Sequence, residues 1–589
     1  MTSTPIAQPA LTLDGVSKTF HVGARAIRAL QEVSLAVSAG QVTGLIGPDG
    51  AGKTTLMRLA AGLIGADSGS LNVLGIDVGT DPLAVQSAIG YMPQRFGLYE
   101  DLTVQENLDL YADLQGVPAE QRPARYAELL HMVGLAPFTG RLAGRLSGGM
   151  KQKLGLACTL VSPPRLLLLD EPTVGVDPVS RRELWAIVYR LVREQGTSVL
   201  LSTAYLDEAE RCDRVLLLHQ GRLLGQGAPA TFSDPLAGHS YALTADVPKR
   251  RLQTRLAQLP GVVDAIIEGE KVRVVMREAA PPGATALAEI APGVRVTPVV
   301  PRFEDAFITR LRAADSDPAS AADLSPPRPQ PVDGGDTAVI AVDQVQRRFG
   351  DFYAVKGVSF EVRRGEVFGL LGANGAGKST TFRMLCGLLP ASAGHVQVAG
   401  HDLRHAAARA RGRIGYMAQR FSLYANLTVA QNLNFFANAY SLPRARRAAR
   451  IRWALDSFDL ATYADQTSGD LSLGYKQRLA LAAALMHEPD ILFLDEPTSG
   501  VDPLARREFW HRINLLAEAG VTVLVTTHFM DEANYCDRLL VMAEGETLAQ
   551  GTPAEMKARF RSAELPDPTM EDAFIGLIER RAATAEAAA

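Results

Sequence analysis

The chain has 589 residues, 47% hydrophobic and 21% charged, a composition that excludes a disordered protein and predicts several domains with large cores. Its 60 basic and 64 acidic residues give a net charge of −4, which argues against broad non-specific binding of nucleic acid but still allows a local basic patch. Four cysteines are too few for a disulfide framework, so we expect buried thiols in a reducing compartment.

The N-terminal residues carry no targeting signal that we recognise. The stretch MTSTPIAQPALTLDG lacks the basic start and apolar core of a secretory signal. No stretch of the chain reaches the roughly 18 consecutive apolar residues that a membrane-spanning helix needs. We therefore expect a cytoplasmic protein, which could still bind a membrane protein.

The first motif in chain order is the glycine-rich loop GPDGAGKT, which follows a strand-like run and precedes a helical pattern. Glycines let backbone N–H groups wrap phosphates, and the helix that follows presents its positive end to them. We expect Lys53 to reach the outer phosphates and the Thr54 hydroxyl to bind Mg²⁺. The predicted nucleotide-binding residues of this loop are Gly47, Pro48, Asp49, Gly50, Ala51, Gly52, Lys53 and Thr54.

The apolar run LLLLDE at 166–171 predicts a buried strand that ends in two carboxylates. Asp170 is expected to hold Mg²⁺ through water, and Glu171 to polarise the attacking water in phosphoryl transfer. Such a run is common and, by itself, is weak evidence for a catalytic site. It gains weight because it lies 117 to 118 residues after Lys53 and is followed by Pro-Thr.

The first half continues beyond these motifs into a segment of different character. Residues 239–311 contain short β-like runs (HSYALTADV, KVRVVMRE, VRVTPVV) around the helical RLQTRLAQL, which predicts a small α+β appendage closing the first half. Residues 312–337 are rich in Pro, Ala, Asp and Ser and predict a solvated, semi-extended linker.

The second half repeats the first. Lys53 and Lys378, Gln94 and Gln419, and Glu171 and Glu496 are each 325 residues apart, a register that indicates a duplicated domain. We assign 11–238 and 338–560 to the two copies and 561–589 to a helical tail. The second copy reaches its EDAFI ending sooner and so lacks the appendage. Its counterparts for nucleotide and Mg²⁺ are Gly372, Ala373, Asn374, Gly375, Ala376, Gly377, Lys378, Ser379 and Asp495. Glu496 is the counterpart of Glu171 and is expected to polarise the attacking water.

LSGGMKQK at 146–153, together with the DEPT and DEA strings, resembles the ATP-binding-cassette ATPases over most of both halves. The resemblance implies an α/β fold with two P-loop ABC nucleotide-binding domains, each with a RecA-like core, an antiparallel β subdomain and a helical subdomain. The tandem arrangement, the EDAFI endings and YMPQRFGLY look like the ATP-binding subunit of a bacterial ABC-2-type multidrug exporter. In that family two cassettes pair head to tail, and each ATP lies between one P-loop and the other signature.

The same resemblance assigns further roles, residue by residue. Gln94 and Gln419 would sense Mg²⁺, water and the transmembrane partner, and His528 would donate to the γ-phosphate. Phe20 and Phe349 would stack on adenine, although core packing explains them as well. The remaining residues implied to lie near nucleotide are Asp177 and Asp502 of the loop that crosses the dimer, and Ser147, Gly148, Gly149, Ser472 and Gly474 of the signatures.

Two departures from the family pattern fall on one expected site. Ala204 stands where the second copy has His528, and Leu473 stands where the family has the first signature glycine. Ala204 belongs to the cassette of the first P-loop, and head-to-tail pairing would bring Leu473 to the same site. We therefore expect a consensus site on the second P-loop and a slow, degenerate one on the first, the alternative being drift without kinetic consequence.

The partners implied are membrane permease subunits of ABC-2 type, in two copies or as two related chains, so the protein would be peripheral on the inner face of the cell membrane. A soluble tandem-cassette ATPase acting on the ribosome is the alternative, but there the resemblance would call for a long charged helical linker. The basic run PRARRAARIRW at 443–453 could touch RNA or lipid headgroups, or simply form a solvated helix face.

Overall fold

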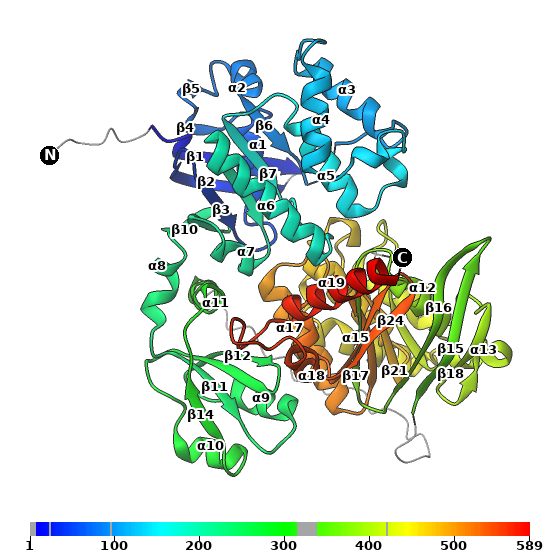
Figure 1. Ribbon diagram of the computed structural model, residues 1–589. Coiled ribbons are helices and arrows are strands. Elements are labelled where there is room, and N and C mark those ends of the chain that lie inside the picture. Colours follow the sequence, from blue (N-terminus) through cyan, green and yellow to red (C-terminus); the bar gives the residue numbers. More distant parts are fainter. Residues whose placement is uncertain (1–7, 23–24, 95–96, 315–337, 420–421, 589) are drawn as a thin grey trace. The chain divides into compact units, whose positions relative to one another are not determined.

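A computed structural model describes residues 8–22, 25–94, 97–314, 338–419 and 422–588 (Figure 1). The chain divides into two compact units, Met1–Ala237 with Pro301–Ala314, and Gly238–Val300 with Asp315–Ala589. The linker predicted at 312–337 lies outside the described residues from residue 315 onward. No helix in the described ranges is long and apolar enough to cross a membrane.

Two sheets build the first unit, one antiparallel with the order β2-β1-β4-β5 and one of order β10-β9-β3-β8-β7-β6 in which only β10 pairs antiparallel. The strands β3, β7 and β8 are buried at every residue, as expected for parallel strands covered on both faces. The strands are β1 (Leu11–Val22), β2 (Arg25–Val37), β3 (Val42–Ile46), β4 (Ser68–Val73), β5 (Ile76–Asp77), β6 (Ile89–Met92), β7 (Leu166–Asp170), β8 (Ser198–Thr203), β9 (Arg214–His219) and β10 (Arg222–Gly227).

The helices of the first unit begin at recognisable caps. The Thr103 side chain and Glu106 form a reciprocal capping box at α3, and Asp177 caps α6 through the Ser180 amide. Helix α11 packs against α7 and α8 in the same unit. The helices are α1 (Lys53–Ala60), α2 (Pro82–Ala88), α3 (Val104–Leu114), α4 (Arg122–Met132), α5 (Gly148–Thr159), α6 (Pro178–Gln195), α7 (Leu206–Glu210), α8 (Ala230–Ser233) and α11 (Phe303–Ala314).

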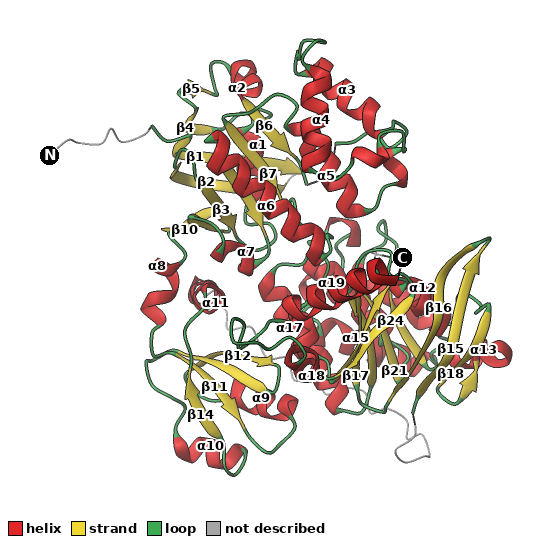
Figure 2. Cartoon of the chain, viewed as in Figure 1, coloured by secondary structure: helices red, strands yellow, loops and turns green. Residues whose placement is uncertain are grey.

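The second unit contains the same two sheets, with orders β16-β15-β18-β19 and β20-β21-β22-β17-β23-β24. Figure 2 shows helices flanking the sheets. Its strands are β15 (Ile340–Phe349), β16 (Phe352–Val362), β17 (Val367–Gly372), β18 (Ala393–Val398), β19 (His401–Asp402), β20 (Ile414–Met417), β21 (Ile491–Asp495), β22 (Thr522–Thr527), β23 (Arg538–Ala543) and β24 (Glu546–Gly551). Its helices are α12 (Lys378–Leu385), α13 (Leu403–Arg411), α14 (Val429–Ala439), α15 (Arg444–Ser457), α16 (Leu473–Ala484), α17 (Pro503–Glu518), α18 (Pro553–Ala558) and α19 (Met570–Ala588).

The segment predicted as an appendage is divided in the structure. Residues 238–300 form a βαββαβ module that belongs to the second unit, while α11 belongs to the first. Its antiparallel sheet has the order β12-β13-β11-β14, the arrangement of a ferredoxin-like fold. The range 239–311 is therefore not one structural unit. The module's elements are β11 (Ser240–Thr244), α9 (Lys249–Ala257), β12 (Val262–Glu268), β13 (Lys271–Met276), α10 (Ala284–Ile290) and β14 (Arg295–Pro298).

Candidate active sites

The first P-loop joins β3 to α1 with backbone that only glycine tolerates at two positions. A Cβ on Gly47 would lie 2.2 Å from the Leu218 carbonyl oxygen, and one on Gly52, which has a φ of +105°, would lie 2.4 Å from the Ala29 oxygen. Lys53 Nζ donates to the carbonyl oxygens of Gly47 at 2.7 Å and Pro48 at 3.2 Å. The lysine is thus folded over its own loop, the place where an anion would bind.

The second P-loop joins β17 to α12 in the same way. Lys378 Nζ donates to the Gly372 oxygen at 2.6 Å and to the Ala373 oxygen at 3.1 Å. Gly377 has a φ of +98°, and a Cβ there would lie 2.6 Å from the Ala354 oxygen. The two loops therefore share one local geometry, as their matching glycine and lysine positions predict.

In each cassette a glutamate directly follows the buried strand β7 or β21, and it accepts a hydrogen bond from the loop glutamine. Gln94 Nε2 donates to Glu171 Oε2 at 2.6 Å, and Gln419 Nε2 donates to Glu496 Oε2 at 2.7 Å. Glu171 and Glu496 both have a positive φ, 51° and 46°, a sparsely populated conformation that is found at functional sites. The sequence-predicted partners of each cassette are thus brought together.

The aspartate before each glutamate is held by a hydroxyl of the neighbouring strand. Ser202 Oγ donates to Asp170 Oδ1 at 2.7 Å, and Thr526 Oγ1 donates to Asp495 Oδ1 at 2.6 Å. Asp170 is 1% exposed, yet its Oδ2 has no hydrogen-bond partner among the described residues. In the second cassette Ser379 Oγ lies 3.5 Å from Asp495 Oδ1.

These groups fit Mg²⁺, which is bound by one or two carboxylates together with substrate phosphates and waters. The described residues include no group of three His, Cys, Asp or Glu side chains that could hold a metal ion without such help. A cation would satisfy the Asp170 oxygen that has no donor in the first cassette, and in the second cassette it could share the Ser379 hydroxyl and the Asp495 carboxylate.

The two cassettes differ at the residue that follows strand β8 in the first cassette and strand β22 in the second. His528 is 3% exposed, and its Nδ1 lies 3.1 Å from Glu496 Oε2. Its Nε2 has no hydrogen-bond partner within the described part of the chain. Ala204 is 1% exposed and offers only a methyl group at the matching position. The first cassette therefore lacks the imidazole that lies beside the glutamate in the second.

This difference changes the proton affinity of the two glutamates. Burial raises the pKa of the Glu171 carboxyl above its ordinary range, although Lys53, 3.6 Å away, opposes the shift. Burial acts on Glu496 as well, but His528, Lys378 and Gln419 outweigh it and hold the Glu496 pKa below its ordinary range. The Glu496 carboxyl therefore has the lower pKa of the two and stays ionised to a lower pH than Glu171.

A difference in pH dependence follows from these opposite shifts. A base with a raised pKa becomes protonated first as the pH falls, so activity at the first P-loop should decline at higher pH than activity at the second. We expect the acid limb of the ATPase pH profile to lie at lower pH in Glu171→Gln, where Glu496 works, than in Glu496→Gln, where Glu171 works. Superimposable acid limbs would contradict the assignment.

The two signature segments also differ locally. Ser147 Oγ accepts from the Met150 amide at 3.3 Å and caps α5, whereas the exposed Ser472 makes no side-chain cap at α16. Leu473 is the first residue of that helix. A Cβ on Gly149 would lie 2.8 Å from Ser180 Oγ, so this glycine allows α5 and α6 to approach closely. Gly148 and Gly474 occupy the first turns of α5 and α16.

Two other predicted pairs have clear structural positions. Asp177 and Asp502 cap α6 and α17 by accepting backbone amides, a structural task that is compatible with a place at the dimer. Phe20 and Phe349 lie near the ends of β1 and β15 and are 38% and 47% exposed. Neither belongs to the core, so both rings are accessible to a base.

Sequence reasoning missed a buried glutamate in each DEA string. Glu208 Oε2 accepts from Thr203 Oγ1 at 2.6 Å and from Thr173 Oγ1 at 3.0 Å. Glu532 accepts from Thr527 at 2.7 Å and from Thr498. Each glutamate joins the strand before the switch position to the segment after the catalytic glutamate. Repetition of the DEA string in both halves was the available signal.

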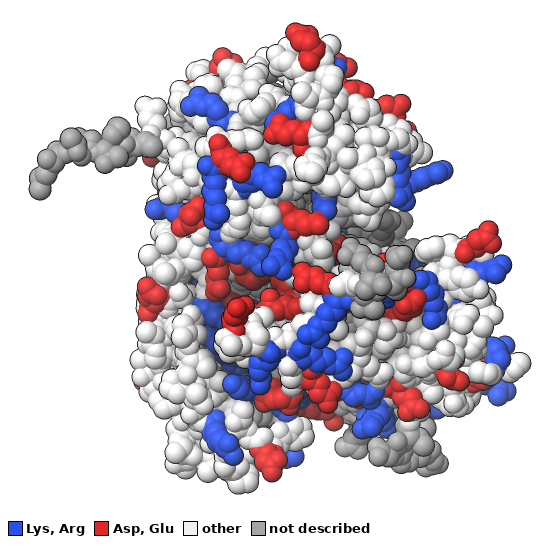
Figure 3. Space-filling model, viewed as in Figure 1, with Lys and Arg blue, Asp and Glu red and all other residues white. Residues whose placement is uncertain are grey.

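The basic run at 443–453 is largely committed to internal contacts. Arg450 donates to the carbonyl oxygens of Leu485 and Met486, and Arg446 pairs with Glu488. Basic and acidic side chains are interspersed on the face shown in Figure 3. The run therefore gives little support to an RNA-binding patch and fits a partly solvated helix face.

Two P-loops, each followed by a buried strand ending in Asp-Glu and met by a loop glutamine, define a pair of nucleotide-hydrolysing cassettes. The model of the ABC transporter family matches residues 30–174 and 355–499. The chain is 53% identical to the probable multidrug ABC transporter ATP-binding protein YbhF of Escherichia coli (strain K12), over 96% of this chain and 97% of that protein. The chain belongs to the ABC transporter family of ATP-binding proteins, and it is an ATPase with two cassettes.

Other proteins are similar to part of the chain. The chain is 43% identical to the Nod factor export ATP-binding protein I of Ralstonia nicotianae (strain ATCC BAA-1114 / GMI1000), over 38% of this chain and 70% of that protein. A solved ATP-binding subunit of an ABC transporter is 29% identical, with a TM-score of 0.38, over 41% of this chain and 99% of that one. The cbiO1 protein of Clostridium perfringens, part of the cbiONQ complex, is 33% identical over 38% of this chain and 92% of that one, with a TM-score of 0.36.

Proposed function

We propose that this protein is the energy-coupling subunit of an exporter of drugs or other small hydrophobic molecules, and that turnover of ATP is concentrated at the second P-loop. The concentration of turnover at the second P-loop is supported by the cluster of Lys378, Gln419, Glu496 and His528. The first cassette has a matching lysine, glutamine and glutamate, but it has Ala204 in place of the histidine. The exporter assignment is supported by the names of two similar proteins, a probable multidrug ABC transporter ATP-binding protein and a Nod factor export ATP-binding protein.

In this proposal Glu496 accepts the proton of the attacking water, Gln419 orients that water, and the free Nε2 of His528 donates to the phosphate as negative charge develops. Asp495 and Ser379 would hold Mg²⁺, which helps to neutralise phosphate charge when bound. Lys378 and the P-loop amides orient the phosphates. In the first cassette Lys53, Thr54, Asp170, Glu171 and Gln94 would take the same roles, without the histidine.

If the cassettes pair head to tail, as the family resemblance implies, the ATP site on the first P-loop has a second departure from the family pattern besides Ala204. Leu473 would then face the nucleotide of the first P-loop, while the regular signature with Ser147, Gly148 and Gly149 would face that of the second. A side chain at a position where glycine permits close backbone approach hinders that approach. We therefore propose that the first site binds ATP mainly as a structural element and hydrolyses it slowly.

The partner proposed is an integral-membrane permease of ABC-2 type, in two copies or as two related chains, with this protein peripheral on the inner face of the membrane. Affinity purification of the full chain from detergent-solubilised membranes tests this assignment. We expect a multispanning membrane protein to co-purify with the chain in stoichiometric amounts. We also expect the purified complex to transport its substrate faster when ATP is present. Co-sedimentation with ribosomes, with no membrane protein recovered, would instead favour the translation-factor alternative.

A further inference from the structure

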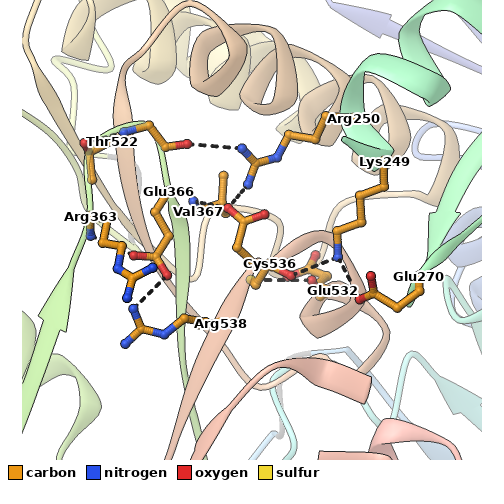
Figure 4. Close-up of polar contacts among 12 residues, drawn as sticks. Lys249, Arg250, Glu270, Arg363, Glu366, Val367, Thr522, Glu532, Cys536 and Arg538 are labelled. Carbon is orange, nitrogen blue, oxygen red and sulfur yellow. Dashed lines mark hydrogen bonds and ion pairs between the residues drawn. The ribbon is translucent and has the colours of Figure 1, made fainter. Parts of the chain in front are cut away.

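The βαββαβ module is seated on the second cassette through α9 and the edge strand β12. Lys249 Nζ donates to the Cys536 oxygen at 3.3 Å, and Arg250 donates to the Gly365 oxygen at 3.1 Å and pairs with Asp537. Figure 4 shows Lys249 and Arg250 reaching from α9 toward the strand ends around Val367 and Cys536. These contacts lie at the start of β17, the strand that leads into the P-loop.

Two buried contacts join the module to α17. Asp264 of β12 pairs with Arg507, and the two side chains are 6% and 8% exposed. Asn514 Nδ2 donates to Gln253 Oε1 of α9 at 2.9 Å, and Asn514 is fully buried. Buried ionic and amide pairs of this kind fix the register of two surfaces, because moving either partner leaves a polar group without compensation.

The docked helix is the one that carries the dimer loop and reaches the switch. Asp502 is its N-cap, and Arg506, next to Arg507, lies 3.7 Å from Glu532. Glu532 in turn accepts from Thr527, the residue before His528. Asp537, the partner of Arg250, also accepts from the Val367 amide at 2.9 Å. The module is therefore connected to His528 by a continuous series of contacts that runs from Arg507 and its neighbour Arg506 through Glu532 to Thr527.

The first cassette does not present an equivalent surface. Arg182, which matches Arg507, is exposed, and Tyr189 takes the position of the buried Asn514. Glu518, whose charge interacts with Arg250 and Arg251 of α9, is replaced there by Arg193. A basic helix such as α9 would meet repulsion and a bulky ring on that face. The surface that receives the module is specific to the second cassette.

We propose that the βαββαβ module is a positioning domain for ATP hydrolysis by the second cassette, holding α17 and the Glu532 segment, and with them Asp502 and His528, in the geometry that turnover needs. Asp264 and Arg250 are positioning residues in this scheme. The inference rests on the proposed turnover at the second P-loop, but its test separates the two ideas.

Asp264→Ala in the full-length protein tests the inference, in a Glu171→Gln background that reports the second site and in a Glu496→Gln background that reports the first. We expect kcat in the first background to fall about tenfold with little change in KM for ATP, because small misplacement of catalytic groups affects chemistry more than binding. We expect no change in the second background. Equal effects in both backgrounds, or none in either, would overturn the inference, whichever site dominates turnover.

Two further variants distinguish positioning from simple loss of stability. Arg507→Met added to Asp264→Ala removes the undercompensated buried cation, and it should recover most of the lost kcat. Arg182→Met, at the matching exposed position of the first cassette, should leave kcat unchanged. Amide hydrogen exchange should quicken in α9 and α17, but not in α6, when Asp264 is replaced. Unchanged exchange in α17 would show that Asp264 does not hold the helix and would overturn the proposal.

Discussion

Glu496→Gln is expected to lower the ATPase rate of the full chain by about 100-fold to 1,000-fold, which is the usual cost of removing a general base. Glu171→Gln should lower it by less than about twofold, because a site without the switch histidine contributes only a small share of turnover. Steady-state phosphate release at saturating ATP measures both. The two carboxylates have equivalent backbone conformations and glutamine partners, so each variant is a matched control for the other. Equal losses would remove the asymmetry.

His528→Ala should lower kcat by about 100-fold to 1,000-fold, because it removes a preorganised donor to the developing phosphate charge. It should also move the acid limb of the pH profile to higher pH. His528 is the principal group holding the Glu496 pKa down against burial, so without it the Glu496 carboxyl would protonate more readily, as Glu171 does. A lower kcat with an unmoved acid limb would mean that His528 does not act on Glu496. Ser202→Ala changes a residue of the first cassette and should leave the limb in place.

The sequence predicted the parts of the fold that follow from local rules. Each P-loop was recognisable because glycines at fixed positions precede a lysine and a helix, and the structure has strand, loop and helix as expected at Gly47 and Gly372. The buried strands ending at Asp170 and Asp495 were equally clear from their unbroken apolar runs. The family assignment and the two-cassette fold are confirmed by the comparisons.

The position of the βαββαβ module could not be predicted in the same way. The segment lies next to the first cassette in sequence, so it was expected to close that cassette, yet Arg250 meets Asp537 at a separation of 287 residues. A contact of that range depends on the surface that Asn514, Glu518 and Arg507 create after folding. No local pattern marks these residues, and only comparison of the two halves position by position reveals them.

The role of the glutamates in the DEA strings could not be predicted from the sequence either. Glu208 and Glu532 each lie four residues after the switch position, and no local pattern in the sequence distinguishes them from solvated carboxylates at the start of a helix. Both are buried, and each accepts from two threonine hydroxyls of separate segments. Their role depends on threonines that come together only in the fold.

The central claim is that Ala204 and Leu473 make the first site slow, and a gain of activity tests it better than a loss, since an unfolded variant cannot gain. The measurement is the ATPase rate of Glu496→Gln with Ala204→His and Leu473→Gly added. The account predicts a rise of at least about tenfold over Glu496→Gln alone, as a donor and close backbone approach are restored around Glu171. A folded, ATP-binding triple variant with no rise would contradict it.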